Sequence, residues 1–523
     1  MPGTPHPTTS ESVQPPLGVS GPRVPAGQVE RPSSLPPARS GARPYLRGYL
    51  IRLLPSLGPG LLMGVIGAVG VTRPVLSWDE VATADVVRRS TGQIWAMIHH
   101  VDAAHGTYYF LMHAWTQLVG TSEWDLRLPS IVAMAVAVGL AGELGRRLFS
   151  PLVGGLAGLF LCLIPNSSRY AAEARPYAFS CLLSVLALLL LHRALRRPGA
   201  ARWIGYGLGV VLLGLSHIVA LTTLAAHAVA VGYQWRHHRS WRTPAAWAAT
   251  VLVALSMLVP LFWLVAGQRE TAFWPDPITP GRLGAAPVAL VGSRPAAWLL
   301  VGLALLAAWR PIDRMVEVTA LLLAPPAALA VISVLVQPLW VPRYLLVVLA
   351  PLALLAAIAT VRADPAGPVR LLRILLVLAV VVATVYPGQR AVREPTAKNG
   401  ADYRGAVRLF QRYGLPADAI LYHDRSRTLR AGVDYYQLGA AYRPQDVLLR
   451  RSAAQSASLI AEEYPDVATH LAGVQRVWLM VNDHPTDPTV RKPAARGVLR
   501  ADFQRVALWR ISGATIALYQ RRG

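Results

Sequence analysis

The chain has few cysteines, few lysines and few charged residues of any kind. Only 15% of its 523 residues are charged, whereas an average soluble protein has about 25%. Its two cysteines, Cys162 and Cys181, both lie inside apolar runs, which favours small buried side chains over a disulfide framework or a metal site. Together with a mean hydropathy of +0.39, this composition excludes an ordinary soluble enzyme and excludes disorder for most of the chain.

Acidic residues are also scarce, because 27 of them face 51 basic residues and leave a formal charge of +24. Lys398 and Lys492 are the only lysines, so arginine carries nearly all of the positive charge. These arginines form short clusters between apolar runs. That arrangement is typical of the cytoplasmic loops of membrane proteins, and it does not predict a nucleic-acid partner.

Apolar runs dominate the middle of the chain. Residues 1–44 are rich in Pro, Gly and Ser and predict a disordered cytoplasmic tail. Residues 45–389 predict a polytopic α-helical membrane domain of about 11 spans, because the runs are long enough, or nearly so, to cross a bilayer. The expected spans are 55–72, 127–145, 152–166, 177–195, 203–217, 219–235, 245–266, 286–308, 315–336, 343–361 and 370–387.

The 15-residue segment 106–120 decides the orientation of everything after it. If it does not span, the arginine clusters at 146–147, 193–197, 236–242, 310–314 and 362–373 all face the cytoplasm. We therefore expect a helix at the outer interface, with Tyr108, Tyr109 and Trp115 at the headgroup level. The prediction is a multi-pass plasma-membrane protein with a cytoplasmic N-terminus and a long first external loop, 73–126.

The last part of the chain has ordinary charge and a different pattern. Segments 476–481 and 514–519 alternate in hydrophobicity like strands, and 402–413 and 452–463 have the amphipathic pattern of helices. Residues 390–523 therefore predict a small extracytoplasmic α/β domain.

Asp79 and Glu80 directly follow the first apolar run. A carboxylate at the rim of a membrane has a raised pKa and suits a general base. Acidic residues equally favour the first turn of a helix, and 81–89 has a helical pattern, so a capping role is the alternative.

The other external loops hold further polar candidates. Asp102 and His105 could bind a divalent cation, a phosphate or a sugar, or they could lie in a solvated turn. Arg175 and Arg343 lie on the outer side against the topological bias, and arginine matches phosphate oxygens. The alternative for the loop around Arg175 is an ion pair of Glu173 with Arg169 or Arg175. The alternative for His217 is a structural role.

The order of these motifs resembles the GT-C glycosyltransferases, in the branch of the protein O-mannosyltransferases and the lipid A aminoarabinose transferase. The resemblance covers most of residues 50–410. It departs from the family at Gly106-Thr107, where many relatives have two prolines. The motifs that carry it are Trp78-Asp79-Glu80, Asp102-Ala-Ala-His105-Gly106-Thr107-Tyr108-Tyr109, Gly120-Thr-Ser122, Leu126-Arg127-Leu128-Pro129-Ser130, Glu173-Ala174-Arg175-Pro176-Tyr177, Arg343-Tyr344 and Asp402-Tyr403-Arg404.

The resemblance implies a GT-C fold and an inverting transfer of a sugar, with mannose expected, from a polyprenyl-phosphate donor to a hydroxyl acceptor. The acceptor would be a glycolipid, a polysaccharide or a protein, and the membrane lipid is the remaining partner. No cofactor is required, although Asp102 and His105 remain candidate ligands of a divalent cation. The implied catalytic residues are Asp79 and Glu80; the phosphate would be bound by Arg175, Arg343 and His105, and the rest of the substrate by Asp102, Glu173, Tyr177, Tyr108, His217 and Tyr344.

Two other classes fit the composition. A transporter or flippase of a lipid-linked substrate would use the external charges along a translocation path, but such proteins usually carry an internal repeat and mid-membrane polar breaks. A non-catalytic membrane scaffold would need neither the acidic pair nor the boundary arginines.

Overall fold

The computed structural model describes residues 42–268, 275–309, 315–362 and 367–523, with side chains from residue 53 onward. The chain divides into two compact units, Met1–Tyr49 and Leu50–Gly523. In the first unit only the beginning of helix α1 is described, and the predicted disordered tail lies almost wholly outside the described residues. All contacts given below lie within the second unit.

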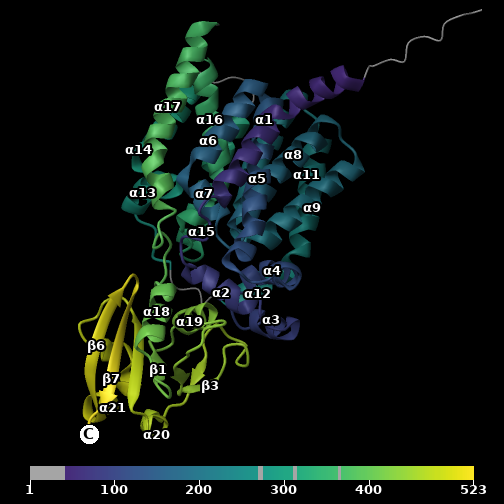
Figure 1. Ribbon diagram of the computed structural model, residues 1–523. Coiled ribbons are helices and arrows are strands. Elements are labelled where there is room, and N and C mark those ends of the chain that lie inside the picture. The colour runs from purple at the N-terminus through teal and green to yellow at the C-terminus, as the bar shows by residue number, and fades with distance from the viewer. Residues whose placement is uncertain (1–41, 269–274, 310–314, 363–366) are drawn as a thin grey trace, which may run out of the picture. The chain divides into compact units, whose positions relative to one another are not determined.

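In the described part of the chain, helices and the segments that join them extend as far as residue 391 (Figure 1). In chain order they are α1 (Ala42–Ala68), α2 (Trp78–Val86), α3 (Thr91–Ile98), η1 (Ala103–His105), α4 (Gly106–Val119), α5 (Glu123–Leu148), α6 (Pro151–Leu163), α7 (Pro165–Ala171), α8 (Tyr177–Arg196), α9 (Ala200–Ser216), η2 (Ile218–Thr223), α10 (Leu224–His238), α11 (Arg242–Met257), α12 (Val259–Gly267), α13 (Pro280–Val291), α14 (Arg294–Trp309), α15 (Met315–Leu335), η4 (Pro342–Val348), α16 (Leu349–Arg362) and α17 (Pro368–Ala391).

Within the described residues, six helices are long and apolar enough to cross a membrane, and nine are if each of three bent pairs forms one span. The bent pairs are α6 with α7, α11 with α12, and α13 with α14. Two shorter apolar helices, Leu53–Ala68 and α9, lie at expected spans without meeting the length requirement. A multi-pass helical protein is therefore shown, whereas the predicted number of 11 spans is not confirmed.

Small residues bring α1, α5 and α6 close together. A Cβ atom on Gly142 would lie 2.4 Å from the carbonyl oxygen of Pro55, and one on Gly154 would lie 2.3 Å from the carbonyl oxygen of Gly142. In lipid, the burial of apolar side chains between helices contributes little free energy, because the lipid tails are equally apolar. Helices there associate through close backbone packing at small residues. The α5 helix also packs along α8, so the helices around α5 form a compact support for the loops at their ends.

All strands in the described part of the chain lie between Ala419 and Arg521. The larger sheet has the order β2-β1-β5-β7-β6, with β1 parallel to β2 and β5, and β7 antiparallel to β5 and β6. A two-stranded ribbon joins β3 to β4. The elements are α18 (Tyr403–Tyr413), β1 (Ala419–Tyr422), α19 (Leu429–Tyr436), β2 (Gln445–Asp446), β3 (Leu449–Arg451), β4 (Glu462–Glu463), α20 (Val467–Leu471), β5 (Arg476–Asn482), η5 (Pro488–Arg491), α21 (Pro493–Asp502), β6 (Phe503–Ile511) and β7 (Ala514–Arg521).

One hydrophobic cluster unites this sheet with the segment between α1 and α5. It contains Leu76, Val81 and Tyr109 from that segment together with Phe410 and Trp478 from the C-terminal part. The predicted domain boundary near residue 390 thus falls where the chain enters a core that it shares with residues 73–126. That boundary and the independence of residues 390–523 stay predictions.

Two local predictions are wrong. Residues 452–461 form turns instead of an amphipathic helix, because Ser452 and Gln455 bond to each other's backbone N–H and Ala457 has a φ of 47°. Side chains of this kind compete with the helix for its backbone groups.

The α4 helix begins at Gly106 and has 14 residues. It is not among the described helices that are long and apolar enough to cross a membrane. Its Tyr108 and Tyr109, expected at the headgroup level, are instead buried inside the protein.

Candidate active site

The α2 helix starts with a capping box that separates the roles of its two acidic residues. The Ser77 hydroxyl accepts a hydrogen bond from the Glu80 N–H at 3.2 Å, and the Glu80 carboxylate accepts one from the Ser77 N–H at 3.0 Å. Such a box satisfies two N–H groups that the first turn leaves without partners. Glu80 therefore points back into the protein, while Asp79 beside it does not take part in the cap.

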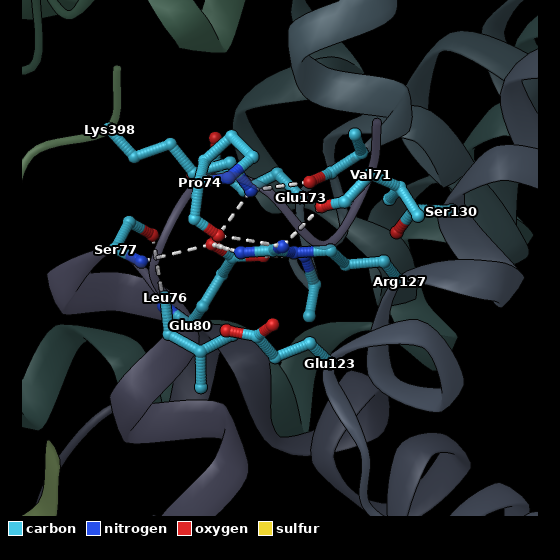
Figure 2. A network of polar contacts seen from close by, with 12 residues as sticks. Val71, Pro74, Leu76, Ser77, Glu80, Glu123, Arg127, Ser130, Glu173 and Lys398 are labelled. Carbon is cyan, nitrogen blue, oxygen red and sulfur yellow. Dashed lines mark hydrogen bonds and ion pairs between the residues drawn. The ribbon is translucent and has the colours of Figure 1, made fainter. Parts of the chain in front are cut away.

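Glu80 lies at the centre of a buried ionic network (Figure 2). Arg127 from α5 approaches its carboxylate at 2.7 Å and Lys398 approaches it from a different side at 2.8 Å. Burial raises the pKa of Glu80, but Arg127 and Lys398 outweigh that effect and hold the pKa well below its usual range. A fully buried, doubly paired carboxylate cannot reach a substrate, so the predicted catalytic role of Glu80 is replaced by a structural one.

Asp79 remains accessible and faces Arg343 at the start of η4. Their side chains approach to 3.6 Å, with 34% of the Asp79 side chain and 25% of the Arg343 side chain exposed. Burial lowers the pKa of Arg175, but nearby groups, Asp79 foremost, raise it well above its usual value. The accessible carboxylate therefore lies within the field of both predicted phosphate-binding arginines.

Arg175, in the loop between α7 and α8, is held by a chain of hydrogen bonds. It donates to His105 Nε2 at 2.9 Å and to the Tyr109 hydroxyl at 3.3 Å. His105 Nδ1 lies 2.8 Å from Asp102, which also accepts a hydrogen bond from Tyr109. Since His105 Nε2 accepts from a guanidinium, the ring carries its proton on Nδ1 and donates it to Asp102.

This chain of contacts keeps Asp102 ionised. Burial raises the pKa of Asp102, but His105 and Arg175 hold it well below its usual range. Asp102 also has a φ of 61°, a left-handed conformation that aspartate tolerates better than most residues. Arg175 is itself 5% exposed, and its Nε atom is buried without a hydrogen-bond partner in the described part of the chain.

Aromatic rings surround the two arginines. The His217 ring lies 4.8 Å from the Tyr344 ring, 5.8 Å from that of Tyr177 and 6.2 Å from that of His105. The Arg343 guanidinium lies 6.0 Å from the ring centre of Tyr177 and 5.9 Å from that of Tyr344. The structure thus brings His217, Tyr177 and Tyr344 together with both arginines.

Glu173 and Tyr108 are buried, as are Arg175 and Tyr177, and their contacts with substrate stay predictions. Glu173 is 3% exposed and its nearest cation is Arg169 at 3.9 Å, which is the ion pair expected as the alternative. Burial raises its pKa. Tyr108 belongs to the hydrophobic cluster with Leu76 and Trp478, and its ring packs edge-on to Phe179.

The donor atoms at Asp102 and His105 do not suit a divalent cation. Both nitrogens of the His105 ring already have partners, Asp102 and Arg175. No group of three or more His, Cys, Asp or Glu side chains suited to a metal ion occurs among the residues with described side chains. We therefore derive no step through a metal.

Sequence reasoning missed the roles of Arg127 and Lys398. Arg127 lies 47 positions from Glu80 and Lys398 lies 318 positions from it, and no local pattern links residues so far apart. The available signal was rarity, since both lysines of an arginine-rich chain are buried in ion pairs.

Comparisons with known proteins found one matching family model and several similar solved structures. Residues 107–263 match the family model described as dolichyl-phosphate-mannose-protein mannosyltransferase. The structure of ArnT from Cupriavidus metallidurans in the apo state is similar with a TM-score of 0.57, and that of ArnT bound to undecaprenyl phosphate with 0.58. Each has 14% sequence identity and covers 91% of this chain and 98% of the ArnT chain. No curated protein sequence matches the chain.

The similarity to ArnT rests on nearly the full length of both chains, and the family match includes α4, α5 and the loop that carries Arg175. The likeness to ArnT shows the fold of this chain, and the family match over residues 107–263 agrees with the expected resemblance to the GT-C glycosyltransferases.

Proposed function

We propose that this protein transfers a sugar from a polyprenyl-phosphate donor to a hydroxyl acceptor at the outer face of the plasma membrane, with inversion at the anomeric carbon. Asp79 is the general base. Arg175 and Arg343 bind the donor phosphate, and His105 orients Arg175. His217, Tyr177 and Tyr344 line the site around the sugar phosphate.

The observation that carries the proposal is the accessible Asp79 carboxylate 3.6 Å from Arg343 and within the field of Arg175. A base and two phosphate-binding cations are what this reaction needs at one place. The acceptor oxygen attacks the anomeric carbon while the bond to the phosphate oxygen breaks. Asp79 takes the hydroxyl proton, and the arginines neutralise the departing phosphate. A phosphate leaves without needing a proton at neutral pH, so a second carboxylic acid is not required.

The similar proteins support a lipid-phosphate donor. One matched ArnT structure is bound to undecaprenyl phosphate, and the matching family model describes mannosyltransferases that use dolichyl-phosphate mannose. We propose mannose as the sugar and a glycolipid, polysaccharide or protein as the acceptor. The six to nine described helices that are long and apolar enough to cross a membrane support a site that a membrane lipid can reach.

The test uses the purified full chain with labelled undecaprenyl-phosphate mannose and a membrane extract as acceptor. Asp79→Asn should lower the transfer rate by about 10²–10⁴-fold, the usual contribution of a general base. Asp85→Asn is the matched control, because Asp85 lies on the same helix in an ion pair with Arg89 at 2.5 Å; it should keep activity near that of the wild type. Transfer by Asp79→Asn at more than a tenth of the wild-type rate would show that Asp79 is not the base.

A further inference from the structure

The segment that follows α17 packs against the residues that lead into α2, the helix that carries Asp79. The Val75 N–H donates to the Pro395 carbonyl at 3.1 Å, and the Trp78 N–H donates to the Asn399 carbonyl at 2.8 Å. A Cβ atom on Gly400 would lie 3.0 Å from the Leu76 carbonyl oxygen, so the two backbones are in close contact. Residues 395–400 therefore support the start of α2 directly.

Lys398 lies in the middle of this segment and is 4% exposed. Its ammonium donates to Glu80 at 2.8 Å and also to the carbonyl oxygen of Ala172. The other oxygen of Glu80 accepts a hydrogen bond from the Ala174 N–H at 3.1 Å. Lys398 and Glu80 thus join α2 to the loop between α7 and α8 (Figure 2).

The two ends of this connection lie close in sequence to proposed active-site groups. Asp79 directly precedes Glu80, and Arg175 directly follows Ala174 and lies three residues after Ala172. A shift of one end would therefore move the base relative to the phosphate-binding arginine. We propose that Lys398 is a positioning residue that fixes Asp79 relative to Arg175 through Glu80 and Ala172, an inference that rests on the proposed function.

Lysine suits this place better than arginine. Its compact ammonium directs three donors from one atom, and here it serves a carboxylate and a backbone carbonyl at once. The charged groups that face it are Glu80 on α2, Arg127 on α5 and Glu173 in the loop. Burial and Arg127 lower the pKa of Lys398 to about 8, while Glu80 and Glu173 oppose them. The ammonium should accordingly lose its proton at mildly alkaline pH, and the connection should weaken there.

The first test measures amide hydrogen exchange in the full-length protein, in peptides that cover residues 75–80 and 172–175. Lys398→Met should speed exchange in both peptides by at least tenfold. Lys492→Met is the matched control, because Lys492 is the other buried lysine and pairs with Glu463 in the C-terminal part. Unchanged exchange in Lys398→Met, or equal changes in the two variants, would overturn the proposal.

The second test is the pH profile of kcat with labelled undecaprenyl-phosphate mannose. The wild type should lose activity above a pH of about 8, and Lys398→Arg should move this decline upward by at least one pH unit. Lys398→Met should lower kcat by about 10²-fold and show no such decline. A loss of that size is typical of a small misplacement of a reacting group. A decline that stays in place in Lys398→Arg would overturn the proposal. If the wild type transfers no sugar at all, the proposed function fails, and the exchange data alone decide the role of Lys398.

Discussion

At the scale of single residues, the contact between Asp79 and Arg343 should differ between the donor-free and the donor-bound protein. Without donor, Arg343 neutralises Asp79 across 3.6 Å, a distance longer than a charge-assisted hydrogen bond. A bound phosphate would compete for the same guanidinium and leave Asp79 free to accept a proton. Donor binding would in this way prepare Asp79 to act as the base. This role depends on the orientation of the Arg343 guanidinium as well as on its positive charge.

The planar side chain of Arg343 supplies that orientation, because it lies by the rings of Tyr177 and Tyr344. Arg343→Lys keeps the charge and loses most of this contact. A cation–π contact contributes about 0.5–2 kcal/mol, so donor affinity in a lipid-binding assay should fall by roughly 2- to 30-fold. Arg412→Lys, which loses a similar contact with Tyr413, is the control. Equal affinities in Arg343→Lys and the wild type would leave the rings without a role in binding.

Residue types at loop ends could predict which side chains meet, but not which of them are buried. Asp79, Arg175, His105 and Arg343 stand out because charge at a membrane boundary is costly. Asp79 and Glu80 carry the same charge. The capping box of Ser77 and Glu80 separates them locally, and the positions of Arg127 and Lys398 bury Glu80 in ion pairs. Those positions depend on tertiary packing across many helices, which no local pattern encodes.

At the scale of elements, the capping box of α2 links helix formation to the site. Ser77→Ala removes the cap and should lower the free energy of unfolding by about 0.5–2 kcal/mol. It also removes the acceptor of the Glu80 N–H next to Asp79, while the Glu80 carboxylate keeps its bond from the backbone N–H at position 77, so kcat should fall by at least threefold. Ser90→Ala is the control, because Ser90 and Gln93 form the same box at the start of α3. Thermal unfolding and transfer assays on both variants check this, and equal losses of kcat would separate the cap from catalysis.

Elements with strong periodicity could be predicted, and those set by turn chemistry could not. The strands β5 and β7 cover the expected segments 476–481 and 514–519, where alternation of apolar residues is clear. Residues 452–463 have a helical pattern as well, yet Ser452 and Gln455 close a turn there. Serine and alanine in a short, partly exposed segment leave helix and turn nearly equal in energy, so local side-chain bonds decide.

At the scale of the whole molecule, the C-terminal part is tied to the helical part by more than the chain connection. Arg404 and Tyr436 both bond to Glu123 at the start of α5, and the Tyr435 hydroxyl donates to the Thr121 carbonyl at 2.8 Å. Together with the shared hydrophobic cluster, these contacts put residues 403–436 on the same side of the membrane as Asp79. The orientation of the protein would thus determine on which side of the membrane the proposed transfer takes place.

Cysteine labelling tests this orientation. The native Cys162 and Cys181 are buried, so a single added cysteine gives the signal. Ala494→Cys on α21 and Ser240→Cys after α10 both replace small exposed residues. Because the arginines near Ser240 favour the cytoplasm, a membrane-impermeant maleimide should label Ala494→Cys in right-side-out vesicles and should label Ser240→Cys only after permeabilisation. The reverse pattern would put Asp79 and the C-terminal part in the cytoplasm and exclude transfer at the outer face.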